Sequence, residues 1–200
     1  MRARLVAAMA VAFLGLQLAG CGVNTIPTEE ERAKAAWSEV LNQYQRRADL
    51  IPNLVETVKG YAAQEKDVLT AVVEARAKAT QVKVDASTIT DPAAFKRFQD
   101  AQAQLSGVLG RLLAIQENYP DLKSNQNFLA LQSQLEGTEN RISVARRDYI
   151  EAVRLYNTEL RTFPGVIWAN ILYRNNKPME TFTITEQQMQ TPKVDFNKKG

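Results

Sequence analysis

The chain has 200 residues, with 25 lysines and arginines against 22 aspartates and glutamates, no histidine and a single cysteine. The lack of histidine removes the commonest proton shuttle at neutral pH and the commonest metal ligand, and one cysteine cannot build an internal disulfide framework. Acidic and basic residues are mixed along the chain without the clustered basic stripe that duplex DNA or anionic lipid selects, so we expect no nucleic-acid partner and a mixed solvated surface.

The first segment, residues 1–20, is predicted to be a secretory signal peptide. Arg2 and Arg4 form a short cationic region, and an apolar run from Leu5 to Leu18 follows, a layout typical of such signals. Its roughly 14 residues fall short of the roughly 20 that cross the hydrocarbon of a bilayer. Removing the signal leaves 23 basic against 22 acidic residues, a net charge of +1, so the basic balance belongs largely to the signal.

The signal ends in Leu18-Ala19-Gly20-Cys21, which matches the box that lipoprotein processing reads. We therefore predict cleavage between Gly20 and Cys21, lipidation of Cys21, and a tether over residues 21–28. Two or three acyl chains would hold the protein at a membrane essentially permanently. The alternatives are an ordinary signal, or an uncleaved anchor, with an inert thiol. Because Gly22 and not aspartate follows, a Gram-negative host is expected to place the lipoprotein in the outer membrane, facing the periplasm.

A long first helix is predicted from Glu29 to about Val82. Its apolar positions recur in steps of three and four: Trp37, Leu41, Tyr44, Ala48, Ile51, Val55, Val58, Ala62, Leu69, Val72 and Ala79. A second apolar row beside the first widens the buried face, which favours a multi-helix bundle. Pro52 lies inside the pattern, and because the stripe keeps its phase there, we expect a kink and not a break.

Charged residues interrupt both rows at Arg47, Glu65 and Arg76. We favour an interpretation in which their stems pack while their charged heads reach solvent. The alternative is that they pair across the bundle, for instance with Arg146 or Glu139, and fix the helix register. The Arg146-Arg147 step itself is expected to be solvated.

Two further helices are predicted. The first of them begins at Asp91-Pro92, an N-cap acid with a proline in the first turn, and ends at Tyr119-Pro120. The next, capped by Ser124, has the clearest period: Phe128, Leu131, Leu135, Thr138, Ile142, Ala145, Tyr149, Ala152 and Tyr156. It is expected to end at Phe163-Pro164-Gly165.

The predicted fold is all-α, an antiparallel up-and-down bundle of three to four long helices over residues 29–173. A short apolar piece, Val166 to Tyr173, ends it. Residues 174–200 are read as an extended tail, in which Thr181 to Thr185 alternates like a strand without an identifiable partner. Large aromatic side chains are expected in the core with their hydroxyls at its boundary: Trp37, Tyr44, Tyr61, Tyr149 and Tyr156.

Several motifs, in order along nearly the whole mature chain, carry a family resemblance. They are Arg47-Ala48-Asp49-Leu50-Ile51-Pro52-Asn53-Leu54-Val55, Tyr119-Pro120-Asp121-Leu122-Lys123, Asn127-Phe128, Leu135-Glu136-Gly137-Thr138-Glu139-Asn140-Arg141-Ile142, Arg146-Arg147-Asp148-Tyr149, Tyr156-Asn157 and Phe163-Pro164. This set resembles the LemA family. The resemblance implies a helical bundle outside the cytoplasmic membrane or in the periplasm, usually on an N-terminal anchor helix, with no established catalytic activity. Two features depart from the family: Ile150 stands where asparagine is common, and a lipobox replaces the anchor helix.

No nucleophile elbow, phosphate-binding glycine loop or Cys/His metal spacing occurs in the sequence. Glu136 and Glu139 share a helix face, but a dimetal carboxylate site of the bundle type also needs Glu-x-x-His motifs. We therefore predict no metal, no cofactor and no enzyme activity. A glycosidase-like pair of acids from different helices stays open, although nothing in the sequence singles out a pair.

Two functions from different classes remain. The favoured one is a membrane-anchored envelope lipoprotein acting as a non-catalytic interaction or scaffold protein with an unknown envelope partner. The alternative is a module that binds a lipid or a cell-wall ligand, or an enzyme using carboxylates in an inter-helix groove.

A comparison of helix lengths suggests where a partner would bind. At about 1.5 Å per residue the predicted first helix would reach about 80 Å and the second only about 40 Å. An apolar stretch would then lie uncovered, and we call it the interaction stripe: Trp37, Val40, Leu41, Tyr44 and Ile51. We slightly favour covering by a second copy, which predicts a homo-oligomer. The alternatives are the C-terminal segment from Val166 folding back, or a helix reversal at Pro52.

Overall fold

The fold is described from a computed structural model that covers residues 22–82, 84–85 and 87–183. Within these residues it contains helices and no strand, and the predicted all-α antiparallel bundle is confirmed. The long helices are α2 (Thr25–Tyr61), α3 (Lys66–Gln81), α4 (Pro92–Ala114) and α6 (Gln126–Glu159). The short ones are η1 (Thr88–Thr90), η2 (Ile115–Asn118), α5 (Pro120–Lys123) and α7 (Gly165–Ile171). The predicted signal peptide and Cys21 lie outside the described residues.

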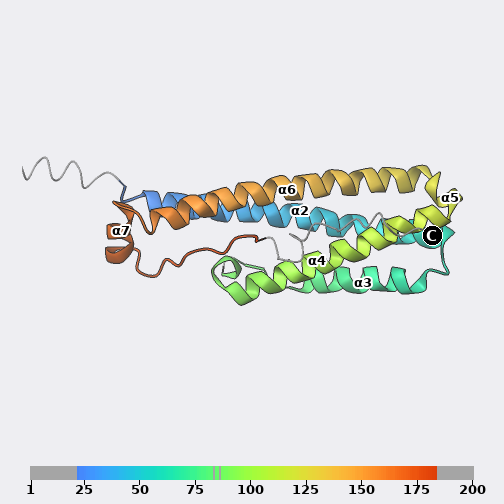
Figure 1. Ribbon diagram of the computed structural model, residues 1–200, viewed down its shortest axis with the longest axis horizontal. Helices are drawn as coiled ribbons and strands as arrows, with labels where there is room; N and C mark the ends of the chain where they lie inside the picture. Colours follow the sequence, from blue (N-terminus) through green and yellow to red (C-terminus); the bar gives the residue numbers. More distant parts are fainter. Residues whose placement is uncertain (1–21, 83, 86, 184–200) are drawn as a thin grey trace, which may run out of the picture.

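The four long helices alternate in direction along the long axis of the molecule (Figure 1). Helices α2 and α6, with 37 and 34 residues, run side by side over lengths of about 50 to 55 Å. Helices α3 and α4 are shorter. They pack against each other and lie along one half of the length of the α2–α6 pair. Helix α6 packs along α2 and not along α4, because the matching lengths of α2 and α6 let them bury their apolar faces against each other.

The chain reverses between α2 and α3, at Ala62 to Glu65, so the prediction of one helix from Glu29 to Val82 is wrong. Ala62 leaves the helical conformation with φ −134° and ψ 48°. The apolar row keeps its phase across the turn because Val58 and Leu69 enter the same core cluster from the two helices. Periodicity reports which face is apolar and does not detect a reversal that preserves that face.

Pro52 lies inside α2, and the helix continues through it, as predicted. Proline has no N–H, so it cannot donate to the carbonyl of Ala48 one turn earlier. The side chain of Arg76 on α3 donates its Nε to that carbonyl oxygen at 2.8 Å. Arg76, which interrupted the first apolar row, therefore caps the gap that Pro52 makes in α2.

The helix starts follow local sequence signals. The Asp91 carboxylate accepts from the backbone N–H of Ala93 and Ala94, at 2.9 and 3.2 Å, so the predicted N-cap of α4 is confirmed. Helix α6 is capped by the Asn125 side chain, which accepts from the N–H of Phe128 at 2.9 Å, and not by Ser124 as predicted. This asparagine lies one residue nearer the helix, where its side chain reaches the third N–H.

The chain after α7 returns along the half of the bundle that α3 and α4 leave open (Figure 1). Asn157 on α6 holds it in two hydrogen bonds, donating to the Met179 carbonyl and accepting from the Met179 N–H, both at 2.9 Å. The Glu180 N–H donates to the Ile89 carbonyl at 2.7 Å, and Phe182 is buried in the core. The described part of the predicted extended tail, residues 174–183, thus packs on the bundle and covers the core.

Candidate functional site

The predicted interaction stripe lies in the interior of the bundle. Trp37, Val40, Tyr44 and Ile51 are buried, and Leu41 is half-buried against the same core. The premise that the stripe is uncovered is wrong, because it derives from an unbroken first helix. Among the three covers considered from the sequence, the structure shows the chain's own C-terminal segment on this half of the bundle, together with α6 and the start of α4.

An aromatic cluster fills the core around Trp37. The Trp37 ring lies 5.2 Å from the rings of Phe98 and Tyr149 and 6.1 Å from that of Phe182, measured between centroids. The Tyr149 hydroxyl donates to the Glu180 carbonyl at 2.7 Å. Core aromatics with hydroxyls at the boundary were predicted, and the burial of Trp37, Tyr44, Tyr149 and Tyr156 confirms this. Tyr61, at the end of α2, is exposed and does not join them.

Arg47 forms the polar centre of the molecule, with a side chain that is only 1% exposed. Its Nη1 donates to Glu139 Oε1 at 2.8 Å and to Ser106 Oγ at 2.7 Å, and its Nη2 donates to Gln102 Oε1 at 2.6 Å. The favoured prediction, that this charge reaches solvent, is wrong for Arg47, and the pairing with Glu139 that was the alternative is present. The network joins α2, α4 and α6 and fixes their register.

A second arginine borders the same core. Arg146, predicted to be solvated, is half-buried, and its guanidinium lies 4.3 Å from the centre of the Phe182 ring, within the range of a cation–π contact. Burial raises the pKa of Tyr44, and the positive charges of Arg146 and Arg47 oppose that rise.

The acids considered from the sequence do not come together. Glu139 pairs with Arg47, and Glu136 accepts from Gln132 Nε2 at 3.0 Å on the surface of α6. Glu65 accepts from the hydroxyl of Tyr119 at 2.8 Å, and this bond raises the pKa of the tyrosine. In residues 22–82, 84–85 and 87–183, no group of three Asp, Glu, His or Cys residues is placed to hold a metal ion.

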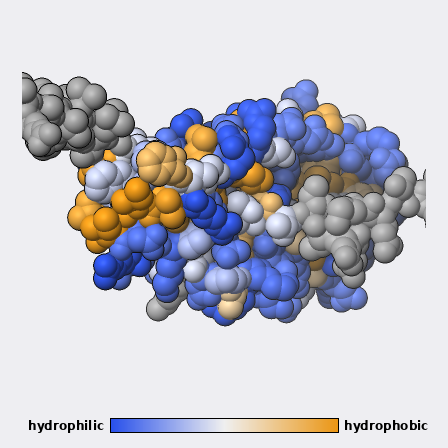
Figure 2. Space-filling view, turned by 60° about the vertical axis from the view of Figure 1, so that its left-hand side comes forward, coloured by the Kyte–Doolittle hydropathy of each residue, from blue (hydrophilic) through white to orange (hydrophobic). Residues whose placement is uncertain are grey.

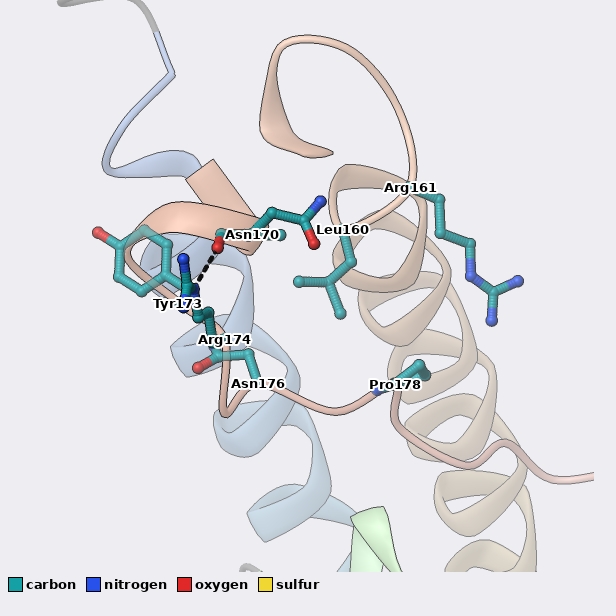
Figure 3. Close-up of a pocket in the computed structure, with 8 residues that line it drawn as sticks. Leu160, Arg161, Asn170, Tyr173, Arg174, Asn176 and Pro178 are labelled. Carbon is teal, nitrogen blue, oxygen red and sulfur yellow. Dashed lines mark hydrogen bonds between the residues drawn. The ribbon is translucent and has the colours of Figure 1, made fainter. Parts of the chain in front are cut away.

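Two open grooves lie side by side at the end of the bundle that carries α7. The larger, of about 570 Å³, lies between the end of α6 and the chain that leaves α7 (Figure 3). Two guanidinium groups border it, from Arg161 and Arg174, and Arg174 Nε donates to the Asn170 carbonyl at 2.6 Å. The smaller, of about 480 Å³, shares Arg161. A groove bordered by two guanidinium groups suits an anionic group, because guanidinium donates charge-assisted hydrogen bonds to carboxylate and phosphate oxygens.

Sequence reasoning missed this groove. Its lining residues come from three separately predicted parts of the chain: the end of the third predicted helix, the short apolar piece from Val166 to Tyr173, and the start of the tail. A usable signal was present: between Leu160 and Lys177 the chain has three basic residues and no acidic one. Such a segment, rich in aromatic and basic residues, is typical of interfacial helices.

No helix among the described residues is long and apolar enough to cross a bilayer.

In sequence comparisons, the model of the LemA family matches residues 36–196. Magnetosome proteins MamQ 1 and MamQ 2 of Paramagnetospirillum magneticum are each 26% identical over 170 residues, which are 77% of this chain and 62% of each relative. Protein LemA of Metamycoplasma hominis is 24% identical over 147 residues, 74% of this chain and 61% of that protein. The chain thus spans about three fifths of these relatives' length, and their names describe no catalytic activity.

Proposed function

The chain belongs to the LemA family, and from that premise we propose that it is a membrane-anchored lipoprotein of the cell envelope that acts as a non-catalytic interaction or scaffold protein. In a Gram-negative host its place would be the outer membrane, facing the periplasm. The anchor is lipidated Cys21, and the partner is another envelope protein or a second copy of the chain.

The observation that carries the proposal is the filled interior of a long bundle. Aromatic rings occupy one half of the core, and Arg47 with its three side-chain partners occupies the centre. Binding is therefore left to the outer faces of the long helices. Exposed apolar side chains lie on these faces, among them Val73 on α3 and Val144 on α6.

The position of the first described residues supports an anchor at one end of the bundle. Gly22 and Val23, which follow the predicted lipidation site, lie at the α7 end, where the Tyr173 hydroxyl donates to the Val23 carbonyl at 3.1 Å. A tether at that point would hold the bundle by one end and leave its sides free for contacts. The similarity to two relatives named as magnetosome proteins supports a role in an assembly.

The experiment is photocrosslinking of the full chain in cells, with a photoreactive amino acid at Val73 or at Val144. We expect discrete adducts with another envelope protein or with a second copy. The photoreactive residue at Arg97, an exposed position on α4, is the control for random collisions. Only diffuse adducts at all three positions would contradict a scaffold.

The groove beside Arg161 and Arg174 favours a second candidate, a module that binds an anionic lipid or cell-wall fragment. Native mass spectrometry of the chain extracted in mild detergent separates the two. A stoichiometric small molecule that is lost in Arg161→Gln/Arg174→Gln supports the binding module.

A further inference from the structure

We propose that the α7 end of the bundle lies on the lipid bilayer through an apolar surface that is distinct from the acyl anchor. This α7 surface consists of exposed side chains at the very end of the molecule: Phe163, Ile167, Ile171 and Leu172. Figure 2 shows apolar side chains gathered at the end that carries α7. The inference rests on the proposed function only for the identity of the membrane.

The orientation of α7 is fixed by packing on its inner side. Trp168 and Ala169 pack against the core cluster of that half of the bundle. A Cβ on Gly165 would collide with the backbone and carboxylate oxygens of Glu159, so glycine allows α7 to sit directly against the end of α6. Ile167 and Ile171, one turn apart, then face outward.

The segment that carries this surface is basic, and the acidic side chains beside it come from other parts of the chain, Glu159 next to Gly165 and Glu30 bonded to Asn176. Arg161, Arg174 and Lys177 are exposed, and no acidic residue lies between Leu160 and Lys177. Arg161 and Arg174 border the larger groove beside α7. Interfacial helices combine apolar and aromatic side chains on one face with lysine and arginine nearby, because anionic lipids attract the cations while the apolar face enters the headgroup boundary.

The first described residue, Gly22, lies at the same place. A Cβ on Gly22 would be 3.2 Å from Cγ of Pro164 and 3.8 Å from Nε1 of Trp168, so the residue after Cys21 touches the segment that carries the α7 surface. An acyl chain on Cys21 would enter the bilayer beside it. The two attachments then act together, since the first holds the second at high local concentration. For this reason we assign the surface to the bilayer and not to a second copy.

The test uses the full chain on vesicles of phosphatidylcholine and phosphatidylglycerol, with and without brominated acyl chains that quench tryptophan. Phe163→Trp/Trp168→Phe places an indole on the α7 surface, where Phe163 is 80% exposed. Leu129→Trp/Trp168→Phe is the matched control, because Leu129 is exposed at the opposite end of α6. Trp37 is buried and gives the same background in both variants. Flotation measures attachment separately.

We expect a blue shift and strong quenching by brominated lipid in the first variant, little quenching in the control, and loss of both signals when Ile167→Ser/Ile171→Ser is added. A floating protein with equal quenching in both variants would overturn the α7 surface and leave the anchor intact. Selective quenching without an acyl group on Cys21, measured by mass, would support the surface and reject the lipid anchor. A full chain that does not float would reject both.

Discussion

Arg47 shows how one residue can hold three helices together. Its guanidinium is buried, while its acid partner Glu139 is 47% exposed. Solvent therefore screens the ion pair on one side, and Ser106 is also exposed, so the bond to the buried Gln102 side chain makes the larger contribution. Losing Arg47 would leave the Gln102 side chain without its donor in the interior.

We predict that Arg47→Met lowers the free energy of unfolding by about 2–3 kcal/mol, since it leaves buried polar groups unpaired. Arg97→Met, the same change at an exposed site of α4, should cost less than about 0.5 kcal/mol. Urea unfolding at neutral pH measures both. Equal effects of the two substitutions would mean that the network does not stabilise the bundle.

Burial raises the pKa of Tyr149, and the nearby carboxylate of Glu180 adds to the rise. In the unfolded chain this tyrosine ionises near pH 10, whereas the folded chain keeps its proton. Above about pH 10 the unfolded state therefore binds fewer protons than the folded state, and stability falls as the pH rises. Tyr44 and Tyr156 shift in the same direction.

We predict that Tyr149→Phe makes the alkaline loss of stability shallower, because one of the groups that cause it is gone. At neutral pH the same change should cost about 1 kcal/mol for the hydrogen bond to the Glu180 carbonyl. Thermal melts between pH 8 and 11 test this. An unchanged slope above pH 10 would show that Tyr149 ionises equally in both states.

For single residues, the sequence predicts which side chains are buried better than it predicts their hydrogen-bond partners. The helical period identifies Trp37, Tyr149 and Tyr156 as core positions because each recurs on one face. The partners of Arg47 lie 55, 59 and 92 residues away along the chain. Their approach depends on where α2 ends and on which helix lies beside it, and neither follows from a local pattern.

At the scale of elements, Pro52 and Arg76 form one unit. Pro52 leaves the Ala48 carbonyl without its helical donor, and Arg76 supplies another from α3. The bond ties α2 to α3 at the point where α2 is weakest, so the cost of an interior proline is partly offset by a contact between helices.

We predict that Pro52→Ala is neutral or stabilising, by up to about 3 kcal/mol, because residue 52 regains its N–H. Arg76→Met should cost about 1 kcal/mol in the natural chain and close to nothing when combined with Pro52→Ala. A double-mutant cycle in urea measures the coupling. Additive effects would show that Arg76 does not serve the carbonyl that Pro52 leaves free.

A second prediction at the scale of elements concerns the segment after α7, residues 174–183, which returns along the bundle. Phe182 is 8% exposed and packs on Trp37, Phe95 and Tyr149. We expect Phe182→Ala to lower the free energy of unfolding by about 2–4 kcal/mol. Phe163→Ala, the same substitution at an exposed position, should be nearly neutral. Thermal melts compare the two, and similar melting temperatures would mean that the segment does not cover the core.

Which elements the sequence predicts depends on how each one ends. Helix α4 carries explicit signals, an N-cap aspartate and a proline, and its start is predicted correctly. The turn after Tyr61 has no proline, and its only breaker, Gly60, lies within α2. The segment around Met179 has no helical period, and it is held by hydrogen bonds from Asn157, a residue whose partner cannot be read from the sequence.

For the whole molecule, the reversal after Tyr61 changes where function can lie. It divides the predicted long helix into α2 and α3, and the predicted interaction stripe is buried. The outer faces of the long helices and the α7 end of the bundle remain as available surfaces. The α7 end carries the first described residues, the two grooves and the α7 surface. A bundle held there would stand away from the membrane with its long faces exposed to partners.

The proposed function depends most on the anchoring of this bundle through Cys21, which intact mass and membrane fractionation test directly. Intact mass and membrane fractionation are compared for the natural chain and for Cys21→Ser, both expressed with the full signal. We expect the natural chain to begin at Cys21, to carry acyl groups and to sediment with membranes, and the variant to stay as a precursor heavier by about 20 residues. A Cys21→Ser chain of normal mature size and normal membrane retention would contradict it.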